Sequence, residues 1–423
     1  MNPAREKQKR KPPAQNPIEA AITTWLSLSP QTDLEPGELI AQAPKRWTAY
    51  EPMVLLPTGA FTISGWQAVL NSSGDQRANE LWKTILSEIS KRSKTELTHL
   101  AVNEGIPLHN EHSESKQQTT TSNTPGDNIL RSPSGLRILY GDFGPSEVLS
   151  ADHDGAGAGA RAAETDFQRA FWVHTKQNGI FQAWAPRWTM FSRGNIKEKA
   201  RLLDFHHADG GAISGGNEER LLQHRKKPPA ELKNAVAVDL YAGIGYFVFS
   251  YARLGMRVLC WELNPWSVEG LRRGANGNGW SVKVVQGADL RLRMEDLLAG
   301  GEQIVVFLED NTRAAGRIRE LRALDGVMHV NCGLLPTSYA SWRDAWEIAG
   351  RSEESWLHLH ENVGVADIAT RKGEIEQWFL ELSRGERNTK AACVEHVELV
   401  KTFAPGVWHC VFDLYITRSS SIT

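Results

Sequence analysis

Two carboxylates and two glycines in the second half of the chain could together bind a nucleoside. Asp239 ends the apolar run AVAV, Gly243 and Gly245 lie in the turn YAGIG that follows, and Glu262 ends the next apolar run, MRVLCW. Glycines let a ligand lie against the backbone, and a carboxylate about twenty residues beyond such a loop can accept hydrogen bonds from ribose hydroxyls. An acidic, glycine-lined site suits the phosphate-free nucleoside S-adenosylmethionine better than NAD.

A short glycine motif is a weak signal by itself. The loop has neither the third glycine of a dinucleotide fingerprint nor the Lys-Ser/Thr of a P-loop. Such motifs often match by chance, so an ordinary strand-turn-helix unit without a ligand is the alternative interpretation.

Strands and helices must place these side chains at one edge of a sheet. Residues 235–238 and 256–261 are predicted to be buried parallel strands, and a helix is predicted to begin near Tyr246. A second helix is predicted over residues 265–274, because Asn264 suits the N-cap and Pro265 suits the first helical position.

The third strand has two candidates. Residues 304–308, IVVFL, lead to Asp310 and Asn311, whose carboxylate and amide could contact adenine and its ribose. Residues 282–286 are less apolar and lead to Asp289. We expect the first segment to be the strand, and Asp289 is the rival cofactor contact.

The remaining apolar runs complete the fold prediction. Strands are predicted at 327–330, 356–359, 394–402 and 407–416, and a helix at 374–382. They predict an α/β fold, a Rossmann-like doubly wound sheet of the class I methyltransferase type, with seven strands and a terminal antiparallel pair. Ligands bind at the carboxyl ends of such strands, where Asn331, His360 and Glu361 are weak candidates for catalytic residues. A satisfied histidine and a structural carboxylate are the simpler interpretation of the last two.

Residues 167–230 combine aromatic and basic side chains just before the glycine loop. The stretch PRWTMFSRGNIKEKAR carries Arg187, Arg193, Lys197 and Arg201, and a basic helix is predicted to begin at Ile196. Aromatic rings stack on bases and cations bind phosphate, so this segment is a candidate RNA-facing surface and approach to the cofactor. A charged helix that is merely solvated is the alternative.

The rest of the chain divides by composition. Residues 1–16 carry basic side chains among prolines and are predicted to be a disordered tail. Residues 17–150 are predicted to be a small α+β region, with helices at 18–28 and 81–89, a strand at 53–56 and a polar insertion at 109–128. The Gly-Ala run within 151–166 predicts a flexible loop, and residues 231–423 are predicted to be the cofactor-binding catalytic domain.

Composition excludes several classes of protein. The formal net charge of −2 excludes a uniformly basic nucleic-acid binder, so RNA contact needs a local basic patch. The four cysteines are dispersed without a C-x-x-C pair, which predicts reduced thiols in a cytoplasmic protein and no metal site. No apolar run approaches the ~20 residues that span a bilayer, so no membrane contact is expected.

Five multi-residue motifs occur in one order along the chain: PRWTMFSRGNIKEKAR, VDLYAGIGYF, WELNPWSVEGLRRG, HVNCGLLPTS and HLHENV. Together they resemble the tRNA wybutosine-synthesising protein 2 family, especially its fungal members. The stretches PKRWTAYEPMVLLP, ILRSPSGLRILYGDFGP and VKTFAPGVWHCVFDLYI fit as well. The resemblance covers most of the chain apart from its tail and polar loops.

The resemblance implies an enzyme that moves the 3-amino-3-carboxypropyl group of S-adenosylmethionine. The acceptor it implies is the tricyclic base next to the anticodon of phenylalanine tRNA, and methylthioadenosine is released. The implied partner is the anticodon stem-loop of tRNA(Phe), with no obligatory protein partner. By position, the resemblance assigns Ser192 and Lys199 to the amino acid end of the cofactor, Glu262 to its ribose, and Asp310 and Asn311 to the family's third motif.

Two other functions remain open at this point. A tRNA guanine-N1 methyltransferase would share the arginine-rich approach to the glycine loop, although Asn331, Gly333 and Pro336 stand where base-methylating relatives often carry Asn-Pro-Pro. That departure argues against plain amino methylation. A non-catalytic RNA-binding module is the third possibility.

Overall fold

The computed structural model describes residues 15–28, 35–104, 135–147, 162, 164–207, 223–321, 326–385 and 390–418. The chain divides into two compact units, Met1–Ser146 and Glu147–Thr423, which are called unit 1 and unit 2 below. Almost all of the predicted tail, the whole of the 109–128 insertion and most of the 151–166 loop lie outside the described residues.

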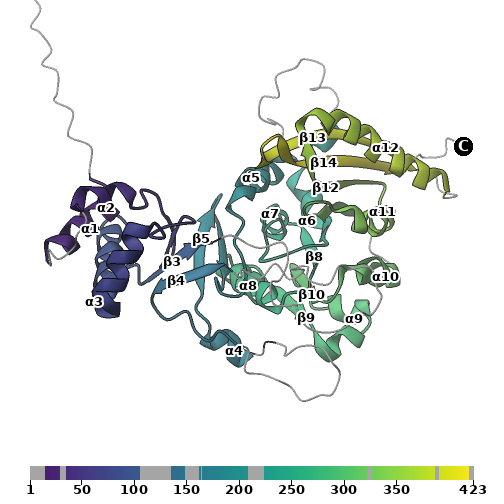
Figure 1. Cartoon of the computed structure of the whole chain (residues 1–423). Coiled ribbons are helices and arrows are strands. Elements are labelled where there is room, and N and C mark those ends of the chain that lie inside the picture. Colours follow the sequence, from purple (N-terminus) through teal and green to yellow (C-terminus); the bar gives the residue numbers. More distant parts are fainter. Residues whose placement is uncertain are drawn as a thin grey trace, which may run out of the picture. The chain divides into compact units, whose positions relative to one another are not determined.

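Unit 1 is the small α+β region expected from the sequence (Figure 1). Its described helices are α1 (Pro17–Ser27), α2 (Pro36–Gln42) and α3 (Ser64–Ser90), and its strands are β1 (Thr48–Tyr50), β2 (Met53–Leu56), β3 (His99–Asn103) and β4 (Leu136–Tyr140). The strands form one sheet in that order, with β2 and β3 parallel and the other neighbours antiparallel. Helix α1 begins where predicted, because the side chain of Asn16 accepts a hydrogen bond from the Ile18 amide.

Unit 2 is built on a mixed sheet of eight strands within the described ranges. The strands are β7 (Val236–Asp239), β8 (Arg257–Glu262), β9 (Val282–Val285), β10 (Ile304–Leu308), β11 (Val327–Cys332), β12 (Glu354–Gly364), β13 (Lys390–Ala404) and β14 (Val407–Arg418). Their order is β13-β14-β12-β11-β7-β8-β10-β9. Strand β14 pairs antiparallel with both β12 and β13, and the other neighbours are parallel.

Helices cover both faces of this sheet, as a doubly wound fold requires (Figure 1). The helices of the sheet region are α6 (Pro229–Asn234), α7 (Val248–Arg253), α8 (Pro265–Gly277), α9 (Met294–Leu298), α10 (Ala314–Glu320), α11 (Trp342–Ala349) and α12 (Ile368–Gly385). Side chains alternate along each strand, so Val236 and Val238 pack under α9 to α12, while Ala237 packs under α6 to α8. The doubly wound sheet with a terminal antiparallel pair is therefore confirmed.

Two details of the sheet differ from the sequence prediction. Both candidates for the third strand are strands: β10 lies beside β8 as expected, and β9 adds an edge strand beyond it, which gives eight strands in the described region instead of seven. Helix α7 begins at Val248, two residues later than Tyr246, because the turn after β7 continues through two glycines with positive φ.

The segment before the sheet folds onto α8. It contains α4 (Glu164–Arg169), the hairpin strands β5 (Val173–Gln177) and β6 (Ile180–Trp184), α5 (Ile196–Asp204) and two short 3₁₀ turns, η1 (Arg193–Asn195) and η2 (Gln223–Arg225). The Asn278 side chain bonds both the amide and the carbonyl of Phe181 at 2.8 Å. A Cβ added at Gly270 would lie 2.8 Å from the Ala183 carbonyl oxygen, and one at Gly277 would lie 2.5 Å from the Phe181 ring. The backbone of β6 therefore needs a glycine at position 270, and the Phe181 ring packs against Gly277.

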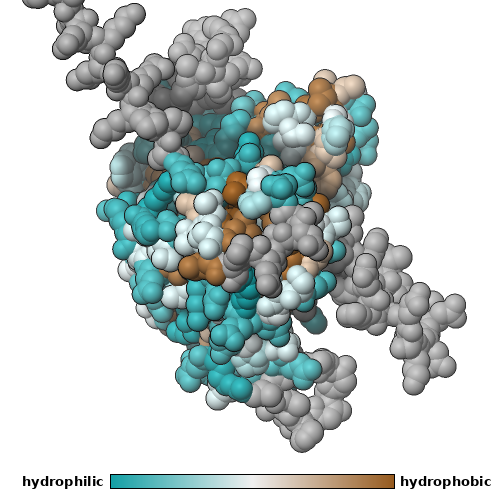
Figure 2. All heavy atoms as spheres, turned by 60° about the vertical axis from the view of Figure 1, so that its left-hand side comes forward, coloured by the Kyte–Doolittle hydropathy of each residue, from teal (hydrophilic) through white to brown (hydrophobic). Residues whose placement is uncertain are grey.

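The surface drawn in Figure 2 is largely hydrophilic, with hydrophobic residues in small patches. Exposed large apolar side chains of unit 2 include Tyr339, Val365 and Phe403. Scattered exposure of this kind is ordinary for a folded protein. None of the helices in the described ranges is both long and apolar enough to cross a membrane.

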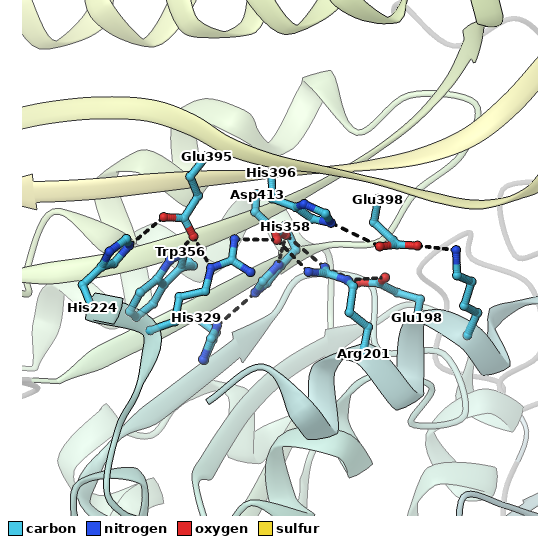
Figure 3. A network of polar contacts seen from close by, with 12 residues as sticks. Glu198, Arg201, His224, His329, Trp356, His358, Glu395, His396, Glu398 and Asp413 are labelled. Carbon is cyan, nitrogen blue, oxygen red and sulfur yellow. Dashed lines mark hydrogen bonds and ion pairs between the residues drawn. The ribbon is translucent and has the colours of Figure 1, made fainter. Parts of the chain in front are cut away.

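A buried ion-pair network, centred on Asp413, joins α5 to the C-terminal strands (Figure 3). The Asp413 carboxylate is fully buried and accepts hydrogen bonds from Arg201 at 2.6 and 3.0 Å and from Arg225 at 3.0 Å. The Nδ1 atom of His358 lies 2.8 Å from the same carboxylate. Burial alone would raise the pKa of Asp413, but the charges of Arg201 and Arg225 outweigh burial and hold that pKa well below its usual range.

The network continues on either side of Asp413. Arg201 also bonds Glu198 on its own helix at 2.7 and 2.8 Å, and Arg225 bonds Glu395 on β13. Glu395 in turn accepts a hydrogen bond from the indole of Trp356 at 2.8 Å. The ion pairs thus connect α5, η2 and strands β12, β13 and β14.

Replacing Asp413 by alanine should lower the free energy of unfolding by about 3–5 kcal/mol, because it leaves two buried guanidinium groups short of a counter-charge. Urea unfolding followed by circular dichroism measures this loss. The matched control is Asp296→Ala, since the Arg293–Asp296 pair is exposed and its removal should leave the midpoint unchanged. An Asp413 variant as stable as the control would contradict the structural role assigned to this network.

Candidate active site

The glycine loop, residues 241–245, lies at the carboxyl end of β7 and needs glycine at two positions. Gly243 and Gly245 have φ values of +53° and +91°, which L-residues with a Cβ rarely adopt. A Cβ on Gly245 would lie 2.5 Å from the Phe249 ring, and one on Gly243 would lie 2.8 Å from the Tyr246 ring. The tight turn brings the loop backbone close to the end of β8.

Glu262 at the end of β8 is hydrogen-bonded to this loop. One carboxylate oxygen accepts from the Gly243 amide at 2.8 Å, and the other accepts from the Asn264 amide at 2.8 Å. Burial raises the pKa of Glu262, while these amide contacts act in the opposite direction. Each carboxylate oxygen can accept a second hydrogen bond, so Glu262 can also bind the hydroxyls of a ribose.

Asp239 and Asn331 form a buried polar pair beneath the loop. The two residues are register partners on β7 and β11, and Asp239 accepts hydrogen bonds from the Tyr241 amide at 3.0 Å and from the Asn331 side chain at 3.3 Å. Burial raises the pKa of Asp239 to about 7. Within the described part of the chain, Asp239 Oδ2 and Asn331 Oδ1 have no hydrogen-bond partner, although both are buried.

The end of β10 lies next to the same loop. The Asn311 side chain donates to the carbonyl of Leu240 at 2.9 Å, and Asp310 caps the following turn by accepting from the Thr312 amide at 2.9 Å. Asp289 lies in a different turn, after the edge strand β9. The strand order therefore places Asp310 and Asn311 one strand nearer to β7 than Asp289.

Lys199 on α5 is a buried cation beside the glycine loop. It is only 4% exposed, and its Nζ donates to Gln177 Oε1 at 2.7 Å and to Gln182 Oε1 at 2.8 Å. Its Nζ also lies 5.3 Å from the centre of the Tyr246 ring, which directly follows the loop. Burial lowers the pKa of Lys199 to about 7.

Ser192 is held close to this lysine by Tyr246. The Ser192 amide donates to the Tyr246 hydroxyl at 3.0 Å, and that hydroxyl donates to the Met190 carbonyl at 2.6 Å. The Phe191 ring, next to Ser192, lies 5.1 Å from the Nζ of Lys199. The structure thus brings Ser192 and Lys199 together at the glycine loop.

The weak catalytic candidates on β12 have contrasting surroundings. Glu361 accepts from the Thr337 hydroxyl at 2.5 Å and forms an ion pair with Arg371 at 3.1 Å, so its carboxylate serves a structural role. His360 is buried against Phe247, with its Nδ1 2.9 Å from His409 Nε2. Burial lowers the pKa of His360 well below its usual range, so the ring is neutral.

The candidate RNA contacts differ in how exposed and how strongly paired their side chains are. Arg193 is exposed, and Arg187 is half-buried. Lys197 has a largely exposed side chain but forms an ion pair with Glu398 at 2.5 Å. The prediction for Arg201 is wrong, because its guanidinium is neutralised by buried carboxylates and lies beneath α5 instead of facing solvent.

Two residues that sequence reasoning missed, Gln177 and Gln182, belong to the β5–β6 hairpin. Its turn is Asn178-Gly179, with φ values of 52° and 75°. An Asn-Gly pair between apolar runs is a strong hairpin signal, so the hairpin could have been predicted. Nothing in the sequence marks Gln182 as a partner of Lys199.

The residues at these strand ends fit an S-adenosylmethionine molecule. Glu262 offers acceptors for a ribose, the glycine loop keeps its backbone accessible, and Lys199 provides a cation without a carboxylate partner among the described residues. Besides Asp239 Oδ2 and Asn331 Oδ1, the buried atoms without a hydrogen-bond partner in the described region include Gln182 Nε2, Trp188 Nε1 and Asn195 Oδ1. Buried polar groups are nearly always hydrogen-bonded, so these atoms are available to a ligand. The described residues contain no group of histidine, cysteine or carboxylate side chains that could hold a metal ion.

Two relatives that are similar in sequence over most of this chain carry the same name. The chain is 39% identical to tRNA wybutosine-synthesizing protein 2 of Schizosaccharomyces pombe, over 88% of this chain and 72% of that protein. It is 31% identical to the protein of the same name from Saccharomyces cerevisiae, over 91% of this chain and 76% of that protein. The crystal structure of Pyrococcus horikoshii TYW2 in complex with MeSAdo aligns with a TM-score of 0.52 and 15% identity, over 95% of this chain and all of that one, which supports the fold. No protein-family model matches the sequence.

Replacing Glu262 by alanine should weaken the binding of methylthioadenosine about 30-fold, because a charge-assisted hydrogen bond to the ribose is worth about 2 kcal/mol. Isothermal titration calorimetry measures the affinity. Glu295→Ala removes the same charge from an exposed position on α9 and should leave the affinity unchanged. Equal affinities of the Glu262 variant and the wild type would remove Glu262 from the site.

Proposed function

The chain belongs to the tRNA wybutosine-synthesizing protein 2 family, and from this premise we infer that it transfers the 3-amino-3-carboxypropyl group of S-adenosylmethionine to the tricyclic guanosine derivative next to the anticodon of tRNA(Phe). It is thus a transferase of wybutosine synthesis. The single observation that carries the proposal is the 39% identity to the Schizosaccharomyces pombe protein across most of both chains. The site at the ends of β7, β8 and β10 supports it with a fitting set of donors and acceptors.

The chemistry of the donor explains why orientation matters. The sulfonium of S-adenosylmethionine activates each carbon attached to it, and when the γ-carbon of the methionine part is attacked, its bond to sulfur breaks and methylthioadenosine leaves. The base forms the new bond to this carbon and loses a proton. Glu262 and the glycine loop would hold the nucleoside, while Ser192 and Lys199 would hold the amino acid end, so that these residues decide which carbon faces the base.

Neighbouring residues would exclude water from the reacting atoms. Lys199 is buried among the aromatic rings of Phe191 and Tyr246, and Asn331 is fully buried at the end of β11. His360 Nε2 has no hydrogen-bond partner within the described residues, and it stays a weak candidate for receiving the proton. Desolvation and positioning can supply much of the rate, because the sulfonium is a strong leaving group.

The substrate on this proposal is the anticodon stem-loop of tRNA(Phe). Arg193 and Arg187, which lie in the segment between β6 and α5, are the remaining candidates for contact with RNA phosphates. A cytoplasmic location is part of the proposal, and it is supported by four cysteines that all carry free thiols.

Identifying the sulfur-containing product tests the proposed reaction. Incubating the protein with S-adenosylmethionine and tRNA(Phe) that carries the tricyclic precursor should release methylthioadenosine, detected by mass spectrometry, and add the aminocarboxypropyl mass to the tRNA. Unmodified tRNA(Phe) is the control and should give no product. Exclusive release of S-adenosylhomocysteine would indicate a guanine-N1 methyltransferase, and RNA binding without turnover would indicate a non-catalytic module.

The affinity for S-adenosylmethionine should fall as the pH rises above 7. The pKa of Lys199 is about 7 in the free protein, so the ammonium that attracts the cofactor's carboxylate loses its proton above this pH. Binding of the carboxylate favours the protonated form, and proton uptake on binding should appear as a dependence of the calorimetric enthalpy on the buffer. Lys199→Met should bind more weakly and lose this part of the pH dependence. If the variant kept the full pH dependence, another group would be responsible.

A further inference from the structure

Lys199 is a buried cation that the protein leaves without a counter-charge. Both hydrogen bonds of its ammonium go to neutral amide oxygens, those of Gln177 and Gln182, and no ion pair to Lys199 occurs among the described residues. By contrast, two other buried cations of unit 2, Arg201 and Arg225, each contact two carboxylates. Burying a charge is costly unless a counter-charge is supplied, so this position is suited to an anion from a ligand.

The orientation of the Gln182 amide follows from this contact. An ammonium group can only donate hydrogen bonds, so the amide oxygen must face Lys199 and the NH₂ group must point elsewhere. Gln182 is 1% exposed, and within the described chain its Nε2 has no hydrogen-bond partner. The Gln182 side chain therefore contacts the unpaired Lys199 ammonium through its oxygen and keeps a buried N–H donor free on its nitrogen.

We propose that Gln182 is a specificity-determining residue whose Nε2 donates to the carboxylate at the amino acid end of S-adenosylmethionine, beside the remaining N–H of Lys199. This inference rests on the proposed function for the identity of the ligand. The two donors come from different elements, β6 and α5, and together they match the two oxygens of a carboxylate. Gln177 has a positioning role, because it holds the ammonium from the opposite strand of the hairpin.

These two contacts also distinguish S-adenosylmethionine from the product methylthioadenosine. Methylthioadenosine lacks the carboxylate, so it forms neither of these two hydrogen bonds after the group has been transferred. The nucleoside contacts of Glu262 and the glycine loop are the same for both molecules. Gln182 and Lys199 would therefore favour binding of the donor over retention of the spent nucleoside.

Calorimetry with two probes, S-adenosylmethionine and methylthioadenosine, tests the role of Gln182. Gln182→Leu removes the amide N–H that donates the hydrogen bond, and it should lower the affinity for S-adenosylmethionine about tenfold. Gln182→Glu adds a carboxylate that repels the ligand and neutralises Lys199, so it should lower this affinity further. Both variants should bind methylthioadenosine within twofold of the wild type, which also confirms that they fold. Gln377→Glu, an equal change of charge at an exposed position on α12, should change neither affinity.

The outcomes separate this inference from the proposed reaction. The assignment of Gln182 would be overturned if both variants kept the wild-type affinity for S-adenosylmethionine. It would also be overturned if the affinities for both probes fell by the same factor. The product released by the wild type is measured independently, so methyl transfer would refute the proposed function while leaving the binding result for Gln182 intact.

Discussion

The carboxylate of Asp413 organises unit 2, because two arginines from separate segments converge on it. Arg201 comes from α5 and Arg225 from η2, and without Asp413 each would keep only one carboxylate partner, Glu198 or Glu395. The contact positions α5, and α5 carries Lys199 two residues before Arg201. A charge on the last strand of the sheet therefore determines where a candidate cofactor residue lies, although the two are more than two hundred residues apart in the sequence.

The same face of the sheet is unusually polar for a buried surface. His358 and Asp413 on β12 and β14 lie under α5, and His329 on β11 lies 2.9 Å from His358 through their ring nitrogens. The opposite face is a continuous apolar core under α9 to α12. Such a polar layer specifies which segment covers it, because only a helix with complementary charges can satisfy it, and an apolar helix would leave the carboxylate unpaired.

The sequence predicts local features of the fold better than pairings between distant residues. The Asn264 cap, the glycine loop and strands β7, β8 and β10 follow from residue type and periodicity, and they are confirmed. Periodicity cannot distinguish a solvent-facing arginine from one that meets a carboxylate on a distant strand, so the sequence alone does not reveal that Arg201 is paired with Asp413. Residues 282–286 and 304–308 are alternatives for one strand on the sequence alone, because periodicity does not count the strands of a sheet, and the structure contains both. The partners of Lys199 lie on a hairpin whose Asn-Gly signal was available, but their contact with the lysine is a tertiary feature.

Gly270 and Gly277 on α8, which face the β5–β6 hairpin, have a consequence for how this protein can vary. Helix α8 follows the strand that ends in Glu262, and the hairpin carries both glutamines that hold Lys199. The nucleoside half and the amino acid half of the site are thus joined through a close contact between α8 and β6, in which a Cβ at Gly270 would lie 2.8 Å from the Ala183 carbonyl oxygen and one at Gly277 would lie 2.5 Å from the Phe181 ring. A methyl group added at Gly270 would have to push the backbone of β6 away from α8, so a surface that touches no ligand also limits which residues this position can carry.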